Sequence, residues 1–366
     1  MAPLPIRLDG AERVLLVKPS ALGDVVQALP VPATLRRRYP RLRIDWLVEE
    51  EAAPLVLGHP LVAEVVISGR RRWLRQLRAA ATLPAALREM RALAAGLRAR
   101  RYDAVLDLQG LLKSALYVAA TRAPIRIGFA EGREGAPWVL THRVTAPPQP
   151  VHAVRRYLAL AAAVDAAEPV WDFSIAVGAE DRARAAALLA GLPRPRVILH
   201  PAARWRTKLW PVERWRDLAA ALLGEGAGVL VTGSAADAPL AEAIRSGLGP
   251  SARTAAGQAS LKALAALLAE ADAVVSVDSG PMHLAAAVGA PLVALFGATD
   301  PRRTGPFGPA TVLRRDLPCS PCLRRRCRIR ERHRCMLELS PEAVLAAARE
   351  AWGRRAAGAP GMRGGG

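Results

Sequence analysis

Aromatic residues, lysine and acidic residues are all scarce in this chain of 366 residues. Phe, Trp and Tyr make up 4% of it, and 32 acidic residues stand against 52 basic ones, for a net charge of +20. Such an excess indicates an anionic partner, whether a nucleic acid, a membrane surface or a phosphorylated substrate. A non-enzymatic nucleic-acid-binding protein would concentrate its basic residues in a stripe with interleaved aromatics. Here Arg is spread over nearly all predicted helices, so we expect no nucleic-acid partner.

Long hydrophobic runs are also absent. No apolar segment approaches the ~20 residues that a membrane-spanning helix needs. The first 18 residues contain no apolar run of the length of a signal-peptide core before their acids. The Ala-rich segments carry Arg every few positions, as amphipathic surface helices do. We therefore expect a soluble cytoplasmic protein that docks peripherally on a membrane surface.

Cysteine is limited to four residues in one short region, which excludes a scattered disulfide framework. Cys319, Cys322, Cys327 and Cys335 follow the spacing C-x2-C-x4-C-x7-C, with His333 nearby. Four thiolates at this spacing can bind structural zinc tetrahedrally. The second pair lacks a tight knuckle spacing, however, and cytosolic thiols can equally stay reduced and partly buried. Both interpretations stay open at this point.

Short β-rich runs alternate with helical segments through both halves of the chain, which predicts an α/β fold with parallel, doubly wound sheets. A long basic helical segment lies between the third and fourth strands. No Gly-x-Gly-x-x-Gly motif follows any of the strands, and the absence of this motif disfavours a nicotinamide dehydrogenase. The predicted strands cover 13–18, 43–50, 64–68, 102–110, 196–201, 228–233, 273–280 and 291–297; the first helix covers 25–40.

The pattern resets around residues 164–181, where we place a linker. We predict an N-terminal Rossmann-like domain over 1–168 and a C-terminal one over 169–340. The second domain would include the Cys-rich loop 318–336. A helix over 341–356, opened by Ser-Pro-Glu, and a disordered tail over 357–366 would complete the chain.

One candidate phosphate site follows the predicted strand that ends in Asp278-Ser279-Gly280. A helix would begin there, and its free N–H groups and dipole favour a phosphate. Gly280 would let the phosphate approach the backbone, Ser279 can donate a hydroxyl, and His283 lies in the first helical turn. An ordinary capped turn with a buried His would give the same sequence, so the motif alone does not decide.

Cationic and acidic residues follow two other strands of the second half. Arg206 and Lys208 would lie at the same edge of the sheet, where they could neutralise a pyrophosphate leaving group. Alone, they would equally suit a solvated basic loop. Asp237 follows the second strand of this half, where an acid often meets a ribose hydroxyl.

In the first half, the loop after the first strand leads to Asp24 at the start of a helix. A carboxylate at this place can cap the helix. It can also serve as a base aimed at a group held above the loop. The two roles are compatible.

Five segments together, and in this order, resemble glycosyltransferase family 9, the bacterial lipopolysaccharide ADP-heptose heptosyltransferases. The resemblance runs from about Arg13 to Trp352, nearly the whole chain. The segments are KPSALGDVVQALP, WLVEE, DLQGLLKSA, KLWPVERW and SVDSGPMHLAAAVGAPLVALFGATDP.

The resemblance implies a GT-B architecture, in which two Rossmann-like domains face a central cleft, and an inverting transfer of heptose from ADP-heptose. It makes Asp24 the general base on the acceptor hydroxyl and places Lys208 on the donor phosphates. By the same resemblance, the ADP part is held by Asp278, Ser279, Gly280 and His283. No cofactor is then required for the chemistry, which fits the absence of an Asp-x-Asp metal-binding pair.

The acceptor implied by the resemblance is a Kdo–lipid A glycolipid at the anionic cytoplasmic face of the inner membrane. WLVEE, GLLKSA and the basic GRRRW segment are more similar to heptosyltransferase I, which adds the first heptose to Kdo, whereas a Cys-rich segment also occurs in heptosyltransferase II. That second branch, or another acceptor, stays the alternative. Candidate acceptor-binding residues are Ser20, Gly23, Arg70, Arg71, Arg72, Lys113 and Arg122, because ammonium and guanidinium groups bind carboxylates and phosphates.

Overall fold

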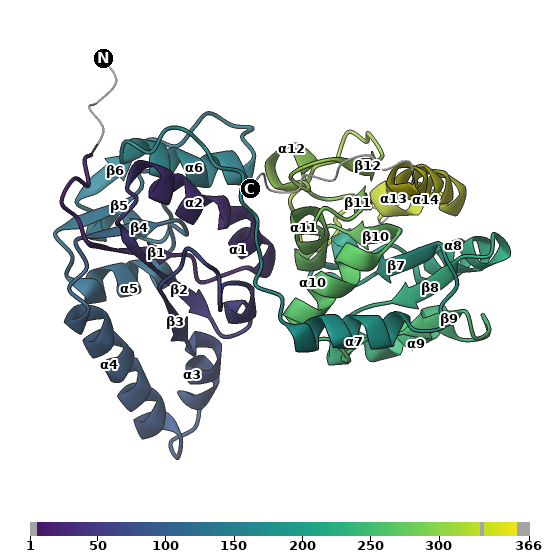
Figure 1. The fold of residues 1–366 in the computed structure, drawn as a ribbon, viewed down its shortest axis with the longest axis horizontal. Coiled ribbons are helices and arrows are strands. Elements are labelled where there is room, and N and C mark those ends of the chain that lie inside the picture. The colour runs from purple at the N-terminus through teal and green to yellow at the C-terminus, as the bar shows by residue number, and fades with distance from the viewer. Residues whose placement is uncertain (1–5, 330–332, 357–366) are drawn as a thin grey trace. The chain divides into compact units, whose positions relative to one another are not determined.

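The computed structural model describes residues 6–329 and 333–356, and the chain divides into two compact units, Met1–Ala176 and Val177–Gly366 (Figure 1). The division falls in the extended segment between a helix that ends at Ala163 and one that begins at Ala179. Each unit is an α/β structure with one parallel sheet. The predicted fold class is therefore confirmed in both halves.

The first unit contains a six-stranded sheet in the order β3-β2-β1-β4-β5-β6, and every neighbouring pair is parallel. Because the order reverses between β1 and β4, the loops after these two strands leave the sheet in opposite directions and open a crevice at its carboxyl edge. The strands are β1 (Arg13–Val17), β2 (Arg43–Glu49), β3 (Glu64–Ser68), β4 (Ala104–Asp107), β5 (Ile125–Phe129) and β6 (His142–Val144).

Helices cover both faces of this sheet, with α1, α2 and α6 in one layer and α3, α4 and α5 in the other (Figure 1). One core joins the inner sides of α4 and α5 to the sheet through Leu15, Val17, Val105 and Val118, all fully buried. The helices are α1 (Leu22–Ala28), α2 (Pro30–Arg38), η1 (Ala53–Leu55), α3 (Arg70–Gln76), α4 (Leu83–Ala99), α5 (Leu112–Thr121), η2 (Ala136–Val139) and α6 (Ala153–Ala163).

The second unit repeats the arrangement, with a parallel sheet in the order β12-β11-β10-β7-β8-β9. Here the order reverses between β7 and β10. The strands are β7 (Arg196–His200), β8 (Gly228–Val231), β9 (Ala252–Thr254), β10 (Ala273–Val277), β11 (Leu292–Phe296) and β12 (Ala310–Arg314).

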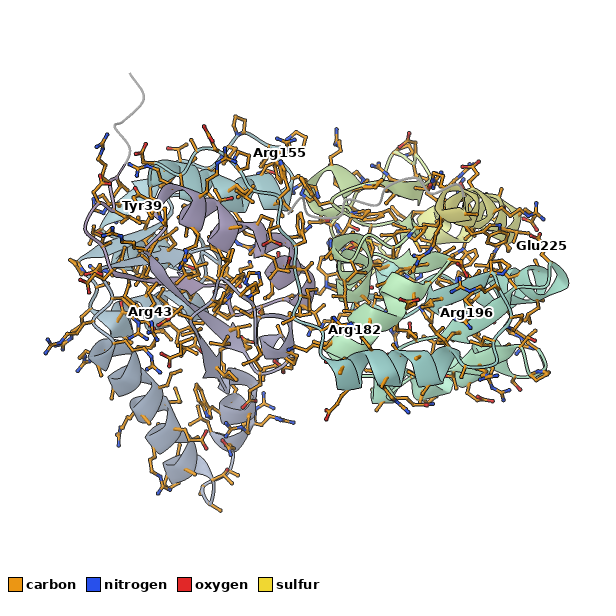
Figure 2. All side chains as sticks on the ribbon, viewed as in Figure 1. Tyr39, Arg43, Arg155, Arg182, Arg196 and Glu225 are labelled. Carbon is orange, nitrogen blue, oxygen red and sulfur yellow. The ribbon has the colours of Figure 1, made fainter. Side chains whose placement is uncertain are left out.

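Its helices also form two layers, and α14 packs with α8 against the sheet. Glu225, labelled in Figure 2, accepts a hydrogen bond of 2.8 Å from Arg349 of α14, which ties this last helix to α8. The helices are α7 (Ala179–Leu189), η3 (Arg206–Lys208), α8 (Val212–Gly224), η4 (Ala235–Asp237), α9 (Ala238–Arg245), α10 (Leu261–Glu270), α11 (Gly280–Ala287), α12 (Pro301–Thr304), α13 (Arg334–Leu337) and α14 (Pro341–Ala356).

The eight predicted strands are all present, most of them shorter at the carboxyl end than predicted. β5, β6, β9 and β12 were not predicted, because these short strands lie at or near the sheet edges and carry weak apolar patterns. The basic segment after β3 is two helices, α3 and α4, instead of one. The predicted helix 25–40 covers the end of α1 and all of α2 and runs two residues past Arg38. The two helices meet at Pro30 because its ring cannot continue a helix.

None of the helices within residues 6–329 and 333–356 is both long and apolar enough to cross a membrane. The predicted disordered tail, 357–366, lies outside the described residues.

Candidate active site

In the first unit, the loop from Lys18 to Ala21 connects β1 to α1 at the point where the strand order reverses. Asp24 is the third residue of α1, and its Oδ2 accepts a hydrogen bond of 3.1 Å from the backbone N–H of Ala21. An acid at this position satisfies one of the free N–H groups at the helix start. The cap that the sequence suggested for Asp24 is therefore present.

The second carboxylate oxygen of Asp24 faces two side chains from other elements. The Tyr157 hydroxyl of α6 donates to Oδ1 over 2.8 Å, and the Lys18 Nζ lies 3.8 Å from the same oxygen. Lys18 is buried with 2% of its surface exposed, whereas the Asp24 side chain is 37% exposed. The carboxylate is thus held from within the protein and still reached by solvent, as a base acting on a bound hydroxyl must be.

Burial fixes the protonation of the groups behind Asp24. It raises the pKa of Tyr157 well above its usual range, with the Asp24 carboxylate as a second cause, so the phenol keeps its proton and donates. Burial lowers the pKa of Lys18, and the Asp24 and Asp107 carboxylates oppose that shift. The Lys18 ammonium also lies 4.6 Å from the centre of the Tyr157 ring. Lys18, Asp24 and Tyr157 therefore form one interacting group.

A second group lies across the same crevice at the start of α5. The Lys113 ammonium donates to the Ser20 hydroxyl and lies 3.4 Å from Oε1 of the buried Glu49. Burial lowers the pKa of Lys113, and Glu49 opposes the shift. The structure thus brings together Ser20 from the loop after β1, Glu49 from the end of β2 and Lys113 from the start of α5.

The three consecutive arginines of α3 have different partners. Arg70 donates to Glu49 over 2.7 Å, and Arg71 lies 3.6 Å from the other oxygen of that carboxylate. Arg72 instead bridges Glu50 and Glu89, at 3.0 and 2.7 Å. Arg70 and Arg71 therefore join the Lys113 group, whereas Arg72 ties α3 to α4 and to the end of β2.

Two further predicted acceptor-binding residues lie elsewhere. Gly23 is buried in the first turn of α1, beside Asp24 in sequence. Arg122 follows the last residue of α5 in a left-handed backbone conformation, at the opposite end of that helix from Lys113. Since α5 runs back from the carboxyl edge of the sheet, Arg122 is not brought to the crevice.

In the second unit, the residues after β7 and β10 meet where the strand order reverses. The Lys208 Nζ lies 2.6 Å from Oδ2 of Asp278, and the Thr299 hydroxyl donates to the same oxygen over 2.5 Å. Asp278 is 4% exposed and Lys208 17%. Lys208 also lies 4.9 Å from the centre of the Trp205 ring. A buried carboxylate therefore orients this lysine at the carboxyl edge of the sheet.

Helix α11 begins directly beside this pair. Ser279 is its N-cap residue but makes no capping hydrogen bond with its side chain; its hydroxyl lies 3.3 Å from that of Ser276. Gly280 and Pro281 form the first turn, and His283 is buried in it. The helix start thus presents backbone N–H groups that its own cap side chain does not satisfy, as an anion site requires.

Arg206 and Asp237 complete the predicted donor-site residues. Arg206 is exposed in η3, two residues before Lys208. The Asp237 carboxylate accepts hydrogen bonds from the Ser234 backbone and hydroxyl, at 2.8 and 2.6 Å, so it stabilises the turn after β8. Both lie at the carboxyl edge of the second sheet; of the two cationic residues in η3, Lys208 is the one that forms an ion pair with Asp278.

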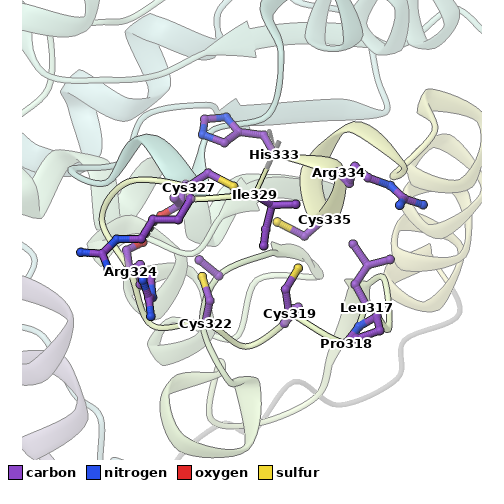
Figure 3. Close-up of a pocket in the computed structure, with 14 residues that line it drawn as sticks. Leu317, Pro318, Cys319, Cys322, Arg324, Cys327, Ile329, His333, Arg334 and Cys335 are labelled. Atoms are coloured by element: carbon purple, nitrogen blue, oxygen red, sulfur yellow. Dashed lines mark hydrogen bonds between the residues drawn. The ribbon is translucent and has the colours of Figure 1, made fainter. Parts of the chain in front are cut away.

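The four cysteines line one cavity of about 550 Å³ in the second unit, together with His333 (Figure 3). None of the four forms a disulfide within the described residues. Burial is the main cause that raises the pKa of the Cys335 thiol, and the other three cysteines add to it. Among residues 6–329 and 333–356, no three His, Cys, Asp or Glu side chains are arranged to hold a metal ion. A tetrahedral zinc site needs sulfur atoms about 2.3 Å from one point. The zinc site therefore stays a prediction.

Sequence reasoning missed Lys18, Tyr157, Glu49 and Thr299. Lys18 could have been noticed in the sequence, since a charged residue directly after the buried apolar run 14–17 is unusual. Thr299 lies in the loop after β11, the strand that pairs with β10. Tyr157 carries no signal at all, because only the packing of α6 against α1 brings it to Asp24.

Comparison with known proteins supplies independent findings. The sequence profile of glycosyltransferase family 9 (heptosyltransferase) matches residues 90–333. The chain is 38% identical over 357 residues to lipopolysaccharide heptosyltransferase 1 of Pseudomonas aeruginosa, covering 91% of this chain and 96% of that protein. It is 29% identical over 347 residues to lipopolysaccharide heptosyltransferase 2 of Salmonella typhimurium, covering 91% and 96%. The solved structure of Escherichia coli heptosyltransferase WaaC with ADP is similar, with a TM-score of 0.74 and 28% identity over 93% of this chain and 99% of that one.

Proposed function

Because the chain belongs to glycosyltransferase family 9, we propose that it transfers a heptosyl group from ADP-heptose to the Kdo region of a lipopolysaccharide inner core. The observation that carries the choice of branch is the similarity to heptosyltransferase 1, 38% against 29% for heptosyltransferase 2 over the same share of the chain. The acceptor is then a glycolipid at an anionic membrane face, which suits the net charge of +20.

The donor would bind the second unit at the start of α11. The N–H groups of this helix and the Lys208 ammonium suit a diphosphate, and Asp278 keeps the ammonium in place until the phosphate competes for it. As the bond between the anomeric carbon and the diphosphate oxygen breaks, its electron pair stays on ADP. Lys208 and the helix dipole would stabilise that developing charge without a metal.

The acceptor would bind the first unit. Its hydroxyl oxygen would form the new bond to the anomeric carbon from the face opposite to ADP, with inversion, while its proton passes to Asp24. Tyr157 and Lys18 would hold the carboxylate ionised and oriented. The carboxylate or phosphate groups of the acceptor would bind Lys113, Arg70 and Arg71. They would replace part of the contacts that these three cations make with the Glu49 carboxylate.

Mass spectrometry of products tests both parts of the proposal. The protein is incubated with ADP-heptose and, separately, a Kdo-terminated lipid A precursor and the same molecule already carrying one heptose. We expect heptose to be added to the Kdo acceptor alone. Transfer only to the heptosylated acceptor would instead make the chain a heptosyltransferase II, and no transfer with no release of ADP would overturn the proposal.

The base is tested in the same assay with Asp24→Ala and Asp24→Asn. Removal of a general base lowers kcat by about 10²- to 10⁴-fold. Asp316→Asn is the matched control, since the Asp316 side chain is 98% exposed. Near-normal turnover of Asp24→Ala would refute the assignment of Asp24.

A further inference from the structure

Three large apolar side chains of the first unit are strongly exposed to solvent. Trp138 is 84% exposed, Leu116 61% and Leu112 51%, the three highest values for large apolar residues in the described part of the chain. Single exposed apolar residues are common on protein surfaces, whereas a contiguous group marks an interaction site.

These three residues belong to one surface. Leu112 and Leu116 are one helical turn apart on α5, so they share a face. The loop that leads to Trp138 packs on the start of that helix: the Leu112 N–H donates to Glu134 over 3.2 Å, and η2 contacts α5. We call Leu112, Leu116 and Trp138 the apolar ridge.

The packing of α5 does not account for the ridge. The side of this helix that packs into the protein is made by Ser114, Ala115, Tyr117 and Val118, all buried. A solvated face of an amphipathic helix is normally polar, yet the outward positions here are Leu112, Leu116 and Ala119. Leaving large apolar side chains in water costs free energy that burial against a partner would recover.

The charges beside the ridge indicate the kind of partner. Arg133 and Arg143 are exposed, and Arg143 donates to the carbonyl of Pro137, in the same short helix as Trp138. The nearby acids are engaged locally, since Glu134 accepts from Leu112 and Glu131 from the Ala146 N–H.

The neighbouring helix α4 adds more positive charge. It packs against α5 and holds three Arg, at positions 88, 91 and 98, against one acid, Glu89. That acid is already paired with Arg72 and accepts from the Trp73 indole. A Trp and two Leu flanked by Arg is the composition of surfaces that lie in the headgroup region of a bilayer.

We propose that the apolar ridge docks on an anionic lipid bilayer, with Trp138 and Leu116 in the headgroup region and Arg133 and Arg143 on lipid phosphates. The ridge is continuous with the acceptor group, because Lys113 follows Leu112 directly and turns inward to Ser20 and Glu49. Docking would therefore hold the headgroup of a membrane-embedded glycolipid beside Lys113. Only this last consequence rests on the proposed function.

Vesicle co-sedimentation tests the docking without any transfer reaction. The full chain is mixed with vesicles of phosphatidylethanolamine and phosphatidylglycerol, and with vesicles of phosphatidylcholine alone. We expect binding to the anionic vesicles and a loss of about tenfold or more in the double variant Leu116→Ser/Trp138→Ser, since apolar burial and charge both contribute. Leu337→Ser, which changes an exposed Leu of the second unit, is the control and should bind like the parent.

Thermal unfolding followed by circular dichroism shows whether the double variant is folded. A second measurement does not depend on that variant: brominated lipids in the vesicles should quench the tryptophan fluorescence of the parent chain, and less so that of Trp138→Phe. Equal quenching in both proteins, or equal vesicle binding of the parent and a folded double variant, would overturn the proposal.

Two further readouts separate this inference from its alternatives. Transfer to an acceptor without acyl chains should be unchanged in the double variant; a loss of that activity would mean that the ridge serves the reaction itself and would overturn docking as its role. Sedimentation velocity measures the oligomeric state, and a dimer of the parent that becomes monomeric in the double variant would assign the ridge to a second copy. Vesicle binding that persists when no acceptor is glycosylated supports the ridge while rejecting the proposed function.

Discussion

Lysine is rare in this chain, and its positions are selective. Only four of the 52 basic residues are Lys, at positions 18, 113, 208 and 262. Lys18, Lys113 and Lys208 each lie at the carboxyl edge of a sheet and contact a carboxylate. An ammonium is a compact point charge, whereas a guanidinium is a wide planar fork. Because nearly all other basic residues of the chain are Arg, we infer that the positions of Lys18, Lys113 and Lys208 require the smaller ammonium group.

Lys208 allows this idea to be tested. We expect Lys208→Ala to lower kcat/KM for ADP-heptose by about 10²-fold, because a preorganised charge at the leaving group is lost. Lys208→Arg should also lose activity, because the larger head does not fit between Asp278 and Trp205. Lys262→Arg on α10 is the matched control. Steady-state release of ADP measures all three, and full activity of Lys208→Arg would contradict the size argument.

Tyr157 is expected to position Asp24. Tyr157→Phe removes the hydroxyl that donates to Oδ1, so we expect kcat to fall by about tenfold with little change in KM. The acidic limb of the pH–rate profile should move to higher pH, because a donor that favours the ionised carboxylate is gone. Tyr39→Phe is the control, since the Tyr39 hydroxyl donates to the Val164 carbonyl away from Asp24. An unshifted profile would limit Tyr157 to a role in packing.

At the scale of elements, the reversal of strand order decides which loops meet. β1 and β4 are neighbours although the segment between them holds two other strands, and the same holds for β7 and β10. The two tryptophans of the KLWPVERW segment serve this packing: Trp210 and Trp215 are buried edge to face, 5.0 Å apart, in the core of the second unit. The motif thus combines one candidate catalytic residue, Lys208, with two structural ones.

The junction of β7 and β8 carries a pH dependence. His200 ends β7, and its Nδ1 lies 3.0 Å from the Thr232 hydroxyl; burial lowers the pKa of His200 to about 4, with Asp237 opposing the shift. Between pH 6.5 and 4 the unfolded chain therefore binds a proton that the folded chain does not, and stability falls as pH falls. At pH 5 this costs on the order of 2 kcal/mol.

Guanidinium unfolding at pH 7 and pH 5 measures this dependence against His200→Gln. The carboxylates titrate in both proteins, so the difference between the two midpoint shifts reports on His200. We expect the parent to lose more stability than the variant on going to pH 5. Equal losses would show that His200 is protonated in the folded protein.

At the scale of the whole molecule, the two units have different tasks in the proposed reaction. ADP should bind the second unit alone, and at 100 times its Kd it should stabilise that unit by about 2.7 kcal/mol. Hydrogen exchange with and without ADP should show the largest protection in residues 206–208 and 276–284. Lys208→Ala should reduce it. Protection confined to the loop before Asp24 would contradict the assignment of the donor to the second unit.

The sequence by itself determined the fold class, eight of the strands and the family. These follow from local properties: buried parallel strands are short apolar runs, and the segments that resemble the family are contiguous. For the same reason Asp24 and Asp278 could be selected from sequence, since Asp24 lies in the first turn of a helix and Asp278 directly follows a strand. Lys208 lies in the loop after β7, within one of the segments that resemble the family. The weak edge strands and the break between α3 and α4 could not be predicted, because neither produces a clear period.

Only the tertiary structure decided which side chains meet. Tyr157 reaches Asp24 across 133 positions because α6 packs on α1, and Thr299 reaches Asp278 because β11 pairs with β10. Arg70 and Arg72 look alike in sequence, yet one pairs with the acid beside Lys113 and the other with α4. The exposure of Leu112, Leu116 and Trp138 was equally hidden, because an apolar residue in a helix predicts burial until its neighbours are placed. Contacts between distant positions depend on the order and packing of the elements, which no local pattern encodes.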